Sequence, residues 1–254
     1  MRARILGSGT SSGVPRIGND WGACDPVEPR NRRTRASILI EHGETRVLVD
    51  TSPDMREQLL AADVGEVDAV IWTHDHADHC HGIDDLRQLF HAMHRPVPGY
   101  ARRETLDVLQ ARFAYAFAGR EGYPPTVAAA VLPDKLTIGG ISISVVNQPH
   151  GNIESAGLRF EAGGAVIGYA TDFSHLTEAM AQMYQHLDVW IVDALRHAWH
   201  PTHPTVDAVL GWVDQLSPKR TALIHMDHSM DYSTVAAALP AGVEPGYDGQ
   251  VLEV

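Results

Sequence analysis

A mixed, layered α/β fold, in which helices cover β-sheets, is predicted by two features of the sequence. Short runs rich in Val, Ile and Leu alternate with segments whose apolar residues recur every three or four positions, and this alternation indicates strands followed by helices. Short connections that contain glycine join neighbouring runs near residues 37–50 and 140–171, as in antiparallel hairpins. We therefore expect mixed sheets rather than a purely parallel sheet.

The expected strands are short, and several have the continuous apolar character of strands that are buried on both faces. They lie at residues 37–41, 46–50, 69–73, 165–171, 189–193 and 221–225. The expected helices lie at residues 53–62, 84–94, 104–117, 177–187 and 206–215. No internal repeat, low-complexity tract or Ser/Gly-rich linker divides the chain, so we expect one domain that covers residues 1–254.

Composition narrows the range of functions. The chain has 254 residues, of which 44% are hydrophobic and 20% charged, and this length suffices for one large core. Its formal net charge of −12 argues against the broad cationic surface that proteins need to follow a nucleic-acid backbone. A long RNA or DNA is therefore not an expected partner.

The first residues and the cysteines suggest a reducing compartment. The segment from Met1 to Leu6 has no apolar stretch as long as a secretory signal, and no other segment approaches the length of a membrane span. The two cysteines, Cys24 and Cys80, lie in unrelated contexts and provide neither a disulfide framework nor a CxxC metal motif. We expect a cytoplasmic protein that does not bind membranes.

Potential ligands stand at the ends of the expected strands. Fifteen histidines is a high number for this length, and histidine is the commonest metal ligand. Apolar runs end repeatedly in a His or Asp residue, at Asp50, His74, Asp172, Asp193 and His225. Because loops at strand ends carry the chemistry in layered α/β folds, we expect these ends to converge.

The central motif is H-x-H-x-D-H, which lies between an expected strand and an expected helix. His74 and His76, separated by one residue in an extended turn, can point the same way. Asp78 and His79, at the start of the helix, can aim at a second point nearby. This spacing predicts ligands for two adjacent cations, since burying so many imidazoles and carboxylates without a cation would leave costly unpaired groups.

Three further ligands are expected from distant loops: His150 in Q-P-H-G, Asp172 in A-T-D and His225 in L-I-H. We assign one metal ion to His74, His76 and His150, the other to Asp78, His79 and His225, and the bridging position to Asp172. Imidazole and carboxylate ligands suit two divalent metal ions, Zn²⁺ or Mn²⁺. Taken alone, His150 and His225 could instead be hydrogen-bonded structural residues, and Asp172 could cap a helix before Ser174.

The H-x-H-x-D-H pattern, followed downstream by His, Asp and His, resembles the signature of the metallo-β-lactamase superfamily. The resemblance extends over nearly the whole chain. The segments G-S-G-T-S-S-G-V-P at 7–15, L-V-D-T at 48–51 and G-Y-D-G at 246–249 resemble its PhnP-like branch of phosphoribosyl cyclic phosphate phosphodiesterases. Ribonuclease Z belongs to the same wider branch. The resemblance implies an αββα sandwich of two mixed sheets flanked by helices, with a dimetal site at one edge. It also supports the seven ligands and suggests a homodimer.

Two such cations would stabilise the entering and leaving oxygens of an in-line displacement at phosphorus, with a hydroxide held between them as the expected nucleophile. Asp78 is expected to orient that nucleophile as well as to bind metal. The resemblance places the general acid for the leaving group at His203, in the segment from His197 to His203, and His200 is the alternative. His203 could instead be a surface histidine in a loop that contains proline.

Several other positions have open interpretations. Asp50 and Asp193 could fix the tautomers of ligating imidazoles, or form strand-end turns or helix caps. The loop from Gly7 to Gly13 does not match a P-loop and is interpreted as a turn that lines the site. The one dense basic run could contact an anionic substrate or form a solvated loop, and it consists of Arg30, Arg32, Arg33 and Arg35.

The resemblance is incomplete at one place. The PhnP-like branch has a structural zinc site built from N-terminal cysteines and a histidine near the C-terminal ligand. Here the equivalent stretch, residues 19–25, contains only Cys24, and the histidine would be His228. One thiolate and one imidazole do not make a closed four-ligand site, so we expect no structural zinc. Cys80 is expected to be a buried packing residue.

The sequence thus predicts a metal-dependent hydrolase, with a small cyclic or nucleotide-like phosphodiester as its substrate. Because fold and metals do not fix the bond that is attacked, a thioester or lactone hydrolase on the same site is the alternative. The negative charge and the absence of a long basic arm argue against processing of tRNA ends. A further alternative is a non-catalytic binding protein, which the resemblance to the pyrroloquinoline-quinone biosynthesis branch suggests. The intact ligand set argues against this alternative.

Overall fold

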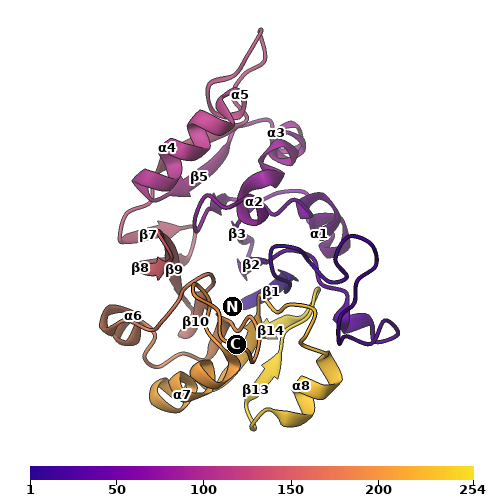
Figure 1. Ribbon diagram of the computed structural model, residues 1–254. Helices are drawn as coiled ribbons and strands as arrows, with labels where there is room; N and C mark the ends of the chain where they lie inside the picture. The colour runs from indigo at the N-terminus through magenta and orange to yellow at the C-terminus, as the bar shows by residue number, and fades with distance from the viewer.

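Two seven-stranded β-sheets pack face to face at the centre of the computed structural model, which describes residues 1–254, and helices cover both outer faces (Figure 1). Each sheet has an antiparallel half and a parallel half. The layers follow the order helix, sheet, sheet, helix, so the predicted αββα sandwich of the α/β class is confirmed.

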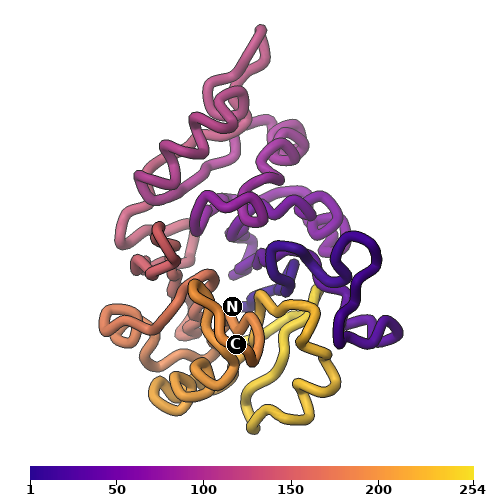
Figure 2. The backbone as a smooth tube through the Cα atoms, viewed as in Figure 1, coloured from indigo at the N-terminus to yellow at the C-terminus, as the bar shows by residue number.

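The first sheet combines the N-terminal strands with the last strand of the chain. In spatial order its strands are β14 (Val251–Glu253), β1 (Arg2–Gly7), β2 (Ser37–His42), β3 (Thr45–Val49), β4 (Ala69–Ile71), β5 (Val97–Ala101) and β6 (Val127–Val131). Pairing is antiparallel from β14 to β3 and parallel from β3 to β6. Because β1 pairs with β14, the chain ends lie side by side, and the amino group of Met1 donates to the carbonyl of Val254 (Figure 2).

The second sheet is built from the C-terminal half of the chain. In spatial order its strands are β13 (Val243–Pro245), β12 (Arg220–Ile224), β11 (Val189–Asp193), β10 (Ala165–Ala170), β9 (Ile153–Ala162), β8 (Ile141–His150) and β7 (Lys135–Ile138). Pairing is antiparallel from β7 to β10 and parallel from β10 to β13. The long hairpin of β8 and β9 turns directly after His150, at Gly151.

Apolar side chains fill the spaces between the layers. Fully buried residues from both sheets, such as Ile38, Val49, Leu158 and Ile191, form the central core. The outer face of the first sheet packs against α1 (Met55–Ala62), α3 (Leu86–Met93), α4 (Arg103–Arg112) and α5 (Ala114–Ala118). The outer face of the second sheet packs against α6 (Glu178–Met183), α7 (Val206–Leu216) and α8 (Tyr232–Ala238). The burial of two faces per sheet explains the continuous apolar runs in the sequence.

Side-chain caps fix the starts of the helices that cover the second sheet. The side chains of Thr177, Thr205 and Asp231 accept hydrogen bonds from backbone amides in the first turns of α6, α7 and α8. Such caps each stabilise a helix by about 1 kcal/mol. They place the start of α7 directly after the loop that carries His203.

The structure departs from the predicted elements in a few places. The helix expected at residues 104–117 is two helices, because the backbone leaves the helical region at Phe113. The helix expected at 177–187 ends at Met183. Strands β1, β5, β6, β7, β13 and β14 were not among the predicted elements. Strand β5 contains Pro98 and Gly99, residues that are unfavourable in strands. Here Gly99 has a packing role, because a Cβ there would lie 2.6 Å from the ring of Trp72.

No helix of this chain combines the length and the apolar character needed to cross a membrane.

Candidate metal centre

Five strands from the parallel halves of the two sheets end at one edge of the sandwich, and each carries a His or Asp side chain at its last position or within the next three residues. The predicted convergence of Asp50, His74, Asp172, Asp193 and His225 is thus present. Three of them adopt left-handed backbone conformations, with φ values of 63° at Asp50, 53° at Asp172 and 59° at His225. Non-glycine residues rarely adopt this region, and such strain concentrates at functional sites.

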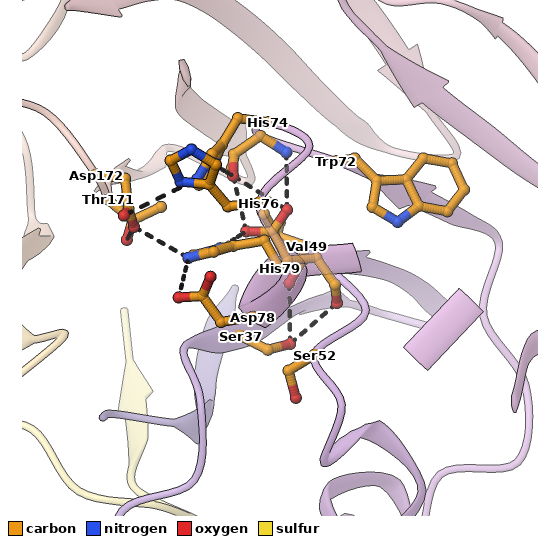
Figure 3. Close-up of polar contacts among 12 residues, drawn as sticks. Ser37, Val49, Ser52, Trp72, His74, His76, Asp78, His79, Thr171 and Asp172 are labelled. Carbon is orange, nitrogen blue, oxygen red and sulfur yellow. Dashed lines mark hydrogen bonds and ion pairs between the residues drawn. The ribbon is translucent and has the colours of Figure 1, made fainter. Parts of the chain in front are cut away.

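The H-x-H-x-D-H segment supplies four of the polar side chains. It leaves β4 as an extended turn and enters the short helix α2 (Ala77–Cys80), which places Asp78 and His79 in the first turn of that helix. The amide of His79 donates to the carbonyl of His76 over 3.0 Å, which closes this turn. In Figure 3 the side chains of His74, Asp78 and His79 point toward Asp172.

One oxygen of Asp172 faces the first set of imidazoles. Its Oδ1 lies 3.9 Å from Nε2 of His74 and 3.6 Å from Nε2 of His150. The Nδ1 of His76 lies 3.3 Å from Nε2 of His150. These four residues offer ligand atoms that all lie within 4.8 Å of one another. Zinc bonds of about 2.0–2.1 Å place neighbouring tetrahedral ligands about 3.3 Å apart, so the spacing is of the right order for one cation.

The other oxygen of Asp172 faces the second set. Its Oδ2 lies 3.1 Å from Nε2 of His79 and 3.5 Å from Nε2 of His225. The Oδ2 of Asp78 lies 3.4 Å and 3.6 Å from the same two nitrogens. The structure therefore brings all seven residues predicted as ligands together, with Asp172 between the two sets.

The buried carboxylates of this cluster require positive charge nearby to remain ionised. Burial alone would lower the pKa of His79, but the carboxylates of Asp172, Asp78 and Asp50 raise it well above its ordinary value. Burial likewise opposes protonation of His225, and Asp172 and Asp193 raise its pKa to about 9. Burial disfavours ionisation of Asp172, yet His225 and His79 hold its pKa well below the usual range. Protons on the two imidazoles thus balance the buried carboxylates, and a bound cation would replace them.

The hydrogen-bonding pattern shows that these residues fit a metal ion. The Nε2 atoms of His74, His79 and His225 are buried and have no hydrogen-bond partner, although buried polar groups are normally paired. Their lone pairs are directed at the carboxylate oxygens of Asp172 and Asp78, which repel them unless a proton or a cation lies between. Imidazole nitrogen and carboxylate oxygen are a donor set that divalent transition metals accept.

Asp50 fixes the orientation of the His79 imidazole. Its Oδ2 lies 2.7 Å from Nδ1 of His79, and its carboxylate also accepts hydrogen bonds from the backbone amide and the hydroxyl of Thr73. This geometry puts the proton of His79 on Nδ1 and turns Nε2 toward Asp172. The predicted role of Asp50 in fixing a tautomer agrees with these contacts.

Asp193 makes the corresponding contact to His203. Its Oδ2 lies 2.7 Å from Nδ1 of His203, whereas its Oδ1 lies 3.9 Å from Nδ1 of His225, beyond hydrogen-bond range. The Nε2 of His203 then faces the centre, 3.8 Å from Oδ1 of Asp172. His200 contacts only Thr202 through its Nδ1 and has no carboxylate partner. Of the two histidines, His203 therefore has the better geometry for a proton donor.

Arg112, which the sequence analysis did not identify, binds the H-x-H-x-D-H segment from outside. Its Nη1 donates to the carbonyl of Asp75 over 2.6 Å, and its Nη2 contacts Oδ2 of the same residue at 3.1 Å. Nη1 also lies 3.5 Å from Sγ of Cys80. Asp75 stands between His74 and His76, so this contact fixes the turn from which both imidazoles project.

We expect Arg112→Ala to weaken zinc binding by roughly 10- to 100-fold, the usual effect of removing a group that orients metal ligands. Competition with a chromophoric chelator measures this affinity without reference to any activity. Arg103→Ala on the same helix, which removes only an exposed pair with Asp107, serves as the control. Equal zinc affinity in both variants would show that Arg112 does not support the turn.

The arginines of the basic run make contacts within the protein. Arg33 is buried, and its Nη2 and Nη1 donate to the carbonyls of Met230 and Asp227 over 2.6 Å and 3.3 Å. The other three arginines of the run are engaged by Glu28, Trp21 and Asp54. Both interpretations offered for this run, substrate contact and a solvated loop, are therefore wrong for Arg33, because its guanidinium ties the N-terminal loop to the segment after His225.

The loop from Gly7 to Gly13 lies beside the site, and hydrogen bonds within the protein hold part of its backbone. The amides of Gly9 and Thr10 donate to the carbonyls of Thr34 and Met226. The carboxylate of Asp248 accepts from the amide and hydroxyl of Ser8. Because Met226 follows His225, this loop braces a predicted ligand.

The two cysteines lie in different surroundings. Sγ of Cys24 lies 3.7 Å from the guanidinium of Arg33, and the carbonyl of His228 accepts from the amide of Ala23. Cys80 is fully buried in the core between the first sheet and its helices, as predicted. Burial raises the pKa of Cys80 to about 11, which keeps it a neutral thiol.

Comparisons with known proteins agree with this fold. Residues 45–226 match the family described as the Beta-lactamase superfamily domain. A solved structure described as a new diphosphatase from the PhnP family has a TM-score of 0.91 at 36% identity, covering 100% of this chain and 97% of that one. Zn²⁺-bound PqqB from Methylobacterium extorquens has a TM-score of 0.80 at 19% identity over the full length of both chains.

Curated relatives have different activities. An octanoyltransferase from Porphyromonas gingivalis is 31% identical over 256 residues, which is 98% of this chain and 51% of that protein, so the chain spans about half the length of this relative. Coenzyme PQQ synthesis protein B from Xanthomonas campestris pv. campestris is 23% identical over 301 residues and 98% of both chains. Fold, family match and His/Asp clusters together support a metal-dependent hydrolase. The chain therefore belongs to the β-lactamase superfamily and, within it, to the PhnP-like branch.

Proposed function

We propose that this chain cleaves a small phosphodiester at a pair of divalent cations. The observation that carries the proposal is the position of Asp172, a single carboxylate that faces two separate His/Asp sets. His203 lies beside it and has a carboxylate partner of its own. The 36% identity to a diphosphatase of the PhnP family supports hydrolysis at phosphorus rather than at carbon.

The proposed ligands form two sets that share one carboxylate. The first consists of His74, His76, His150 and Asp172, and the second of Asp78, His79, His225 and Asp172. Zn²⁺ and Mn²⁺ are the proposed ions, because both accept imidazole and carboxylate. When bound, the pair would neutralise charge at the phosphoryl group and lower the pKa of water at the site.

The chain's own residues perform the remaining tasks. The Nδ1–H of His203 is the proposed donor of the hydrogen bond to Asp193, so its Nε2 can carry the proton that the leaving oxygen requires. Asp78 is more exposed than Asp172, and its carboxylate is the proposed acceptor for a proton of the attacking water. Asp50 keeps the Nε2 of His79 turned toward the reacting centre. Together these contacts hold a proton donor and a proton acceptor near one carboxylate.

A diphosphate bridge is the second candidate for the bond that is cleaved, and the similarity to a PhnP-family diphosphatase favours it. Attack occurs at phosphorus in both cases, and the two substrates differ in the group that leaves. A phosphate leaving group needs less protonation than an alkoxide, so a diphosphatase would depend less on His203 than a phosphodiesterase does.

Four substrates distinguish the functions that this site could perform. The protein is loaded with Zn²⁺ or Mn²⁺ and assayed with bis(p-nitrophenyl) phosphate, a nucleoside diphosphate ester, a thioester and a lactone. We expect turnover of one or both phosphorus substrates and negligible turnover of the other two. Hydrolysis of only the thioester or the lactone, or two bound equivalents of metal with no hydrolysis at all, would contradict the proposal.

A further inference from the structure

Two buried side chains from the N-terminal part of the chain hold the segment that follows His225. This post-ligand segment, residues 226–232, runs from the predicted ligand to the first residue of α8. Asn31 is fully buried and Arg33 is 2% exposed, although arginine side chains are almost never fully buried without a partner. These two residues form the N-terminal clamp.

Arg33 binds the middle of the post-ligand segment through main-chain oxygens. Its Nη2 donates to the carbonyl of Met230 over 2.6 Å, and its Nη1 donates to the carbonyl of Asp227 over 3.3 Å. The same guanidinium lies 3.3 Å from Oδ1 of Asn31 and 3.7 Å from Sγ of Cys24. Burial raises the pKa of the Cys24 thiol, so these acceptors are neutral groups. The contacts therefore fix the segment although they bury a positive charge.

Asn31 binds the far end of the same segment. Its Oδ1 accepts a hydrogen bond from the amide of Tyr232 over 2.7 Å, and its Nδ2 donates to Oδ1 of Asp231 over 2.7 Å. Its Nδ2 also donates to the carbonyl of Asp25 over 3.1 Å. The N-terminal clamp thus contacts the post-ligand segment from Asp227 to Tyr232.

His225 depends on the position of the segment that follows it. Strand β12 pairs with strands on both sides and fixes the chain before this residue. His225 itself has a left-handed backbone with a φ of 59°, a conformation that persists only where its surroundings hold it. The amide of Met226 donates to the carbonyl of Ser8 over 3.1 Å, and the N-terminal clamp holds the residues beyond.

We propose that Arg33 is a positioning residue for the second ligand set and that it acts through the backbone beside His225. This inference rests on the ligand sets of the proposed function but not on the bond that is cleaved. The other members of the second set come from elsewhere, since Asp78 and His79 lie in α2 and Asp172 follows β10. Displacement of the post-ligand segment would therefore move one ligand of the second set and no ligand of the first.

Zinc occupancy measured separately at each ligand set tests this inference. Crystals of the wild-type and Arg33→Met proteins are equilibrated at the same buffered free zinc concentrations, and anomalous peak heights give the occupancy of each set. Methionine is also long and unbranched but donates no hydrogen bond. We expect the zinc affinity of the second set to fall roughly tenfold, the lower end of the effect of groups that orient metal ligands, and that of the first set to be unchanged.

Three further variants show whether the effect is specific. Arg32→Met is the matched control, because Arg32 is the exposed neighbour whose guanidinium lies over the ring of Trp21, and it should leave both affinities unchanged. Arg33→Lys keeps the charge but lacks the planar fork that reaches two carbonyls, so its effect should be intermediate. Arg112→Ala, which releases the turn at Asp75, should weaken the first set instead.

Melting temperature checks that each variant is folded. If the Arg33→Met protein is not, Arg33→Lys and Asn31→Ala take its place, and both should weaken the second set. Chelator competition in solution checks that the two affinities do not depend on the crystal.

Each failure has a separate meaning. If the Arg33 variants weaken both ligand sets equally, or neither, Arg33 is not a positioning residue for the second set and the proposed function is unaffected. If the wild-type protein does not hold zinc at both sets, the proposed pair of cations fails, and the inference fails with it.

Discussion

Asp172→Ala should reduce hydrolysis of bis(p-nitrophenyl) phosphate at least about 10³-fold, because several kcal/mol of charge stabilisation are lost when the cations are not held together. Asp172 directs one oxygen at each ligand set, so its removal affects both. The metal content after dialysis should fall from two equivalents to one or fewer. Elemental analysis of the dialysed protein and the initial rate of hydrolysis measure the two effects independently.

Asp188→Asn is the matched control for this variant. Asp188 precedes β11, whereas Asp172 follows β10 and lies at the opposite end of the same parallel pair. The carboxylate of Asp188 accepts a hydrogen bond from the amide of Val166 and forms an ion pair with Lys219. This variant should retain both metal equivalents and the wild-type rate. An Asp172→Ala protein that kept two equivalents and full activity would exclude the bridging role.

His203→Ala should lower kcat by roughly 10²- to 10⁴-fold on a substrate with an alkoxide leaving group, such as a 2′,3′-cyclic nucleotide, because the departing oxygen loses its proton donor. On bis(p-nitrophenyl) phosphate the reduction should be less than about tenfold, since nitrophenolate leaves without protonation. Metal content should remain at two equivalents, because His203 is not among the proposed ligands. Steady-state kinetics with the two substrates measures the difference.

His200→Ala distinguishes His200 from His203, the other candidate for the proton donor. His200 has no carboxylate partner, so we expect its replacement to affect both substrates equally and only slightly. Loss of metal in the His203→Ala protein, or an equal reduction on both substrates, would argue against a proton donor at this position. A leaving-group dependence that appeared only in His200→Ala would assign the role to His200.

Local patterns in the sequence, together with the resemblance to a known family, were the basis for predicting the candidate site. The H-x-H-x-D-H segment is contiguous, and Asp172 and His225 follow predicted apolar runs that are strands β10 and β12 in the structure. His150 is the last residue of β8, which was not among the predicted runs. Because parallel strands end at the same edge of a sheet, their positions along the chain also predicted that they would meet. The predicted strand at residues 189–193 coincides with β11, and Asp193 at its end reaches the site.

Features that depend on long-range packing could not be predicted in this way. Arg112 reaches Asp75 from a helix 37 residues further along the chain, and no local pattern marks that contact. The left-handed conformation of Asp172 resolves the alternative of a helix cap, but residue type alone does not indicate such a backbone. Strand β5 was missed because its glycine, Gly99, is explained only by a long-range contact: a Cβ at this position would clash with the ring of Trp72, which follows the neighbouring strand β4.

The most direct test of a shared dimetal site is anomalous X-ray scattering from crystals of the zinc-loaded protein. We predict two zinc peaks roughly 3.5–4 Å apart. One should lie among His74, His76 and His150, the other among Asp78, His79 and His225, with the carboxylate of Asp172 contacting both. A single peak, or peaks that these residues do not contact, would contradict the proposed centre.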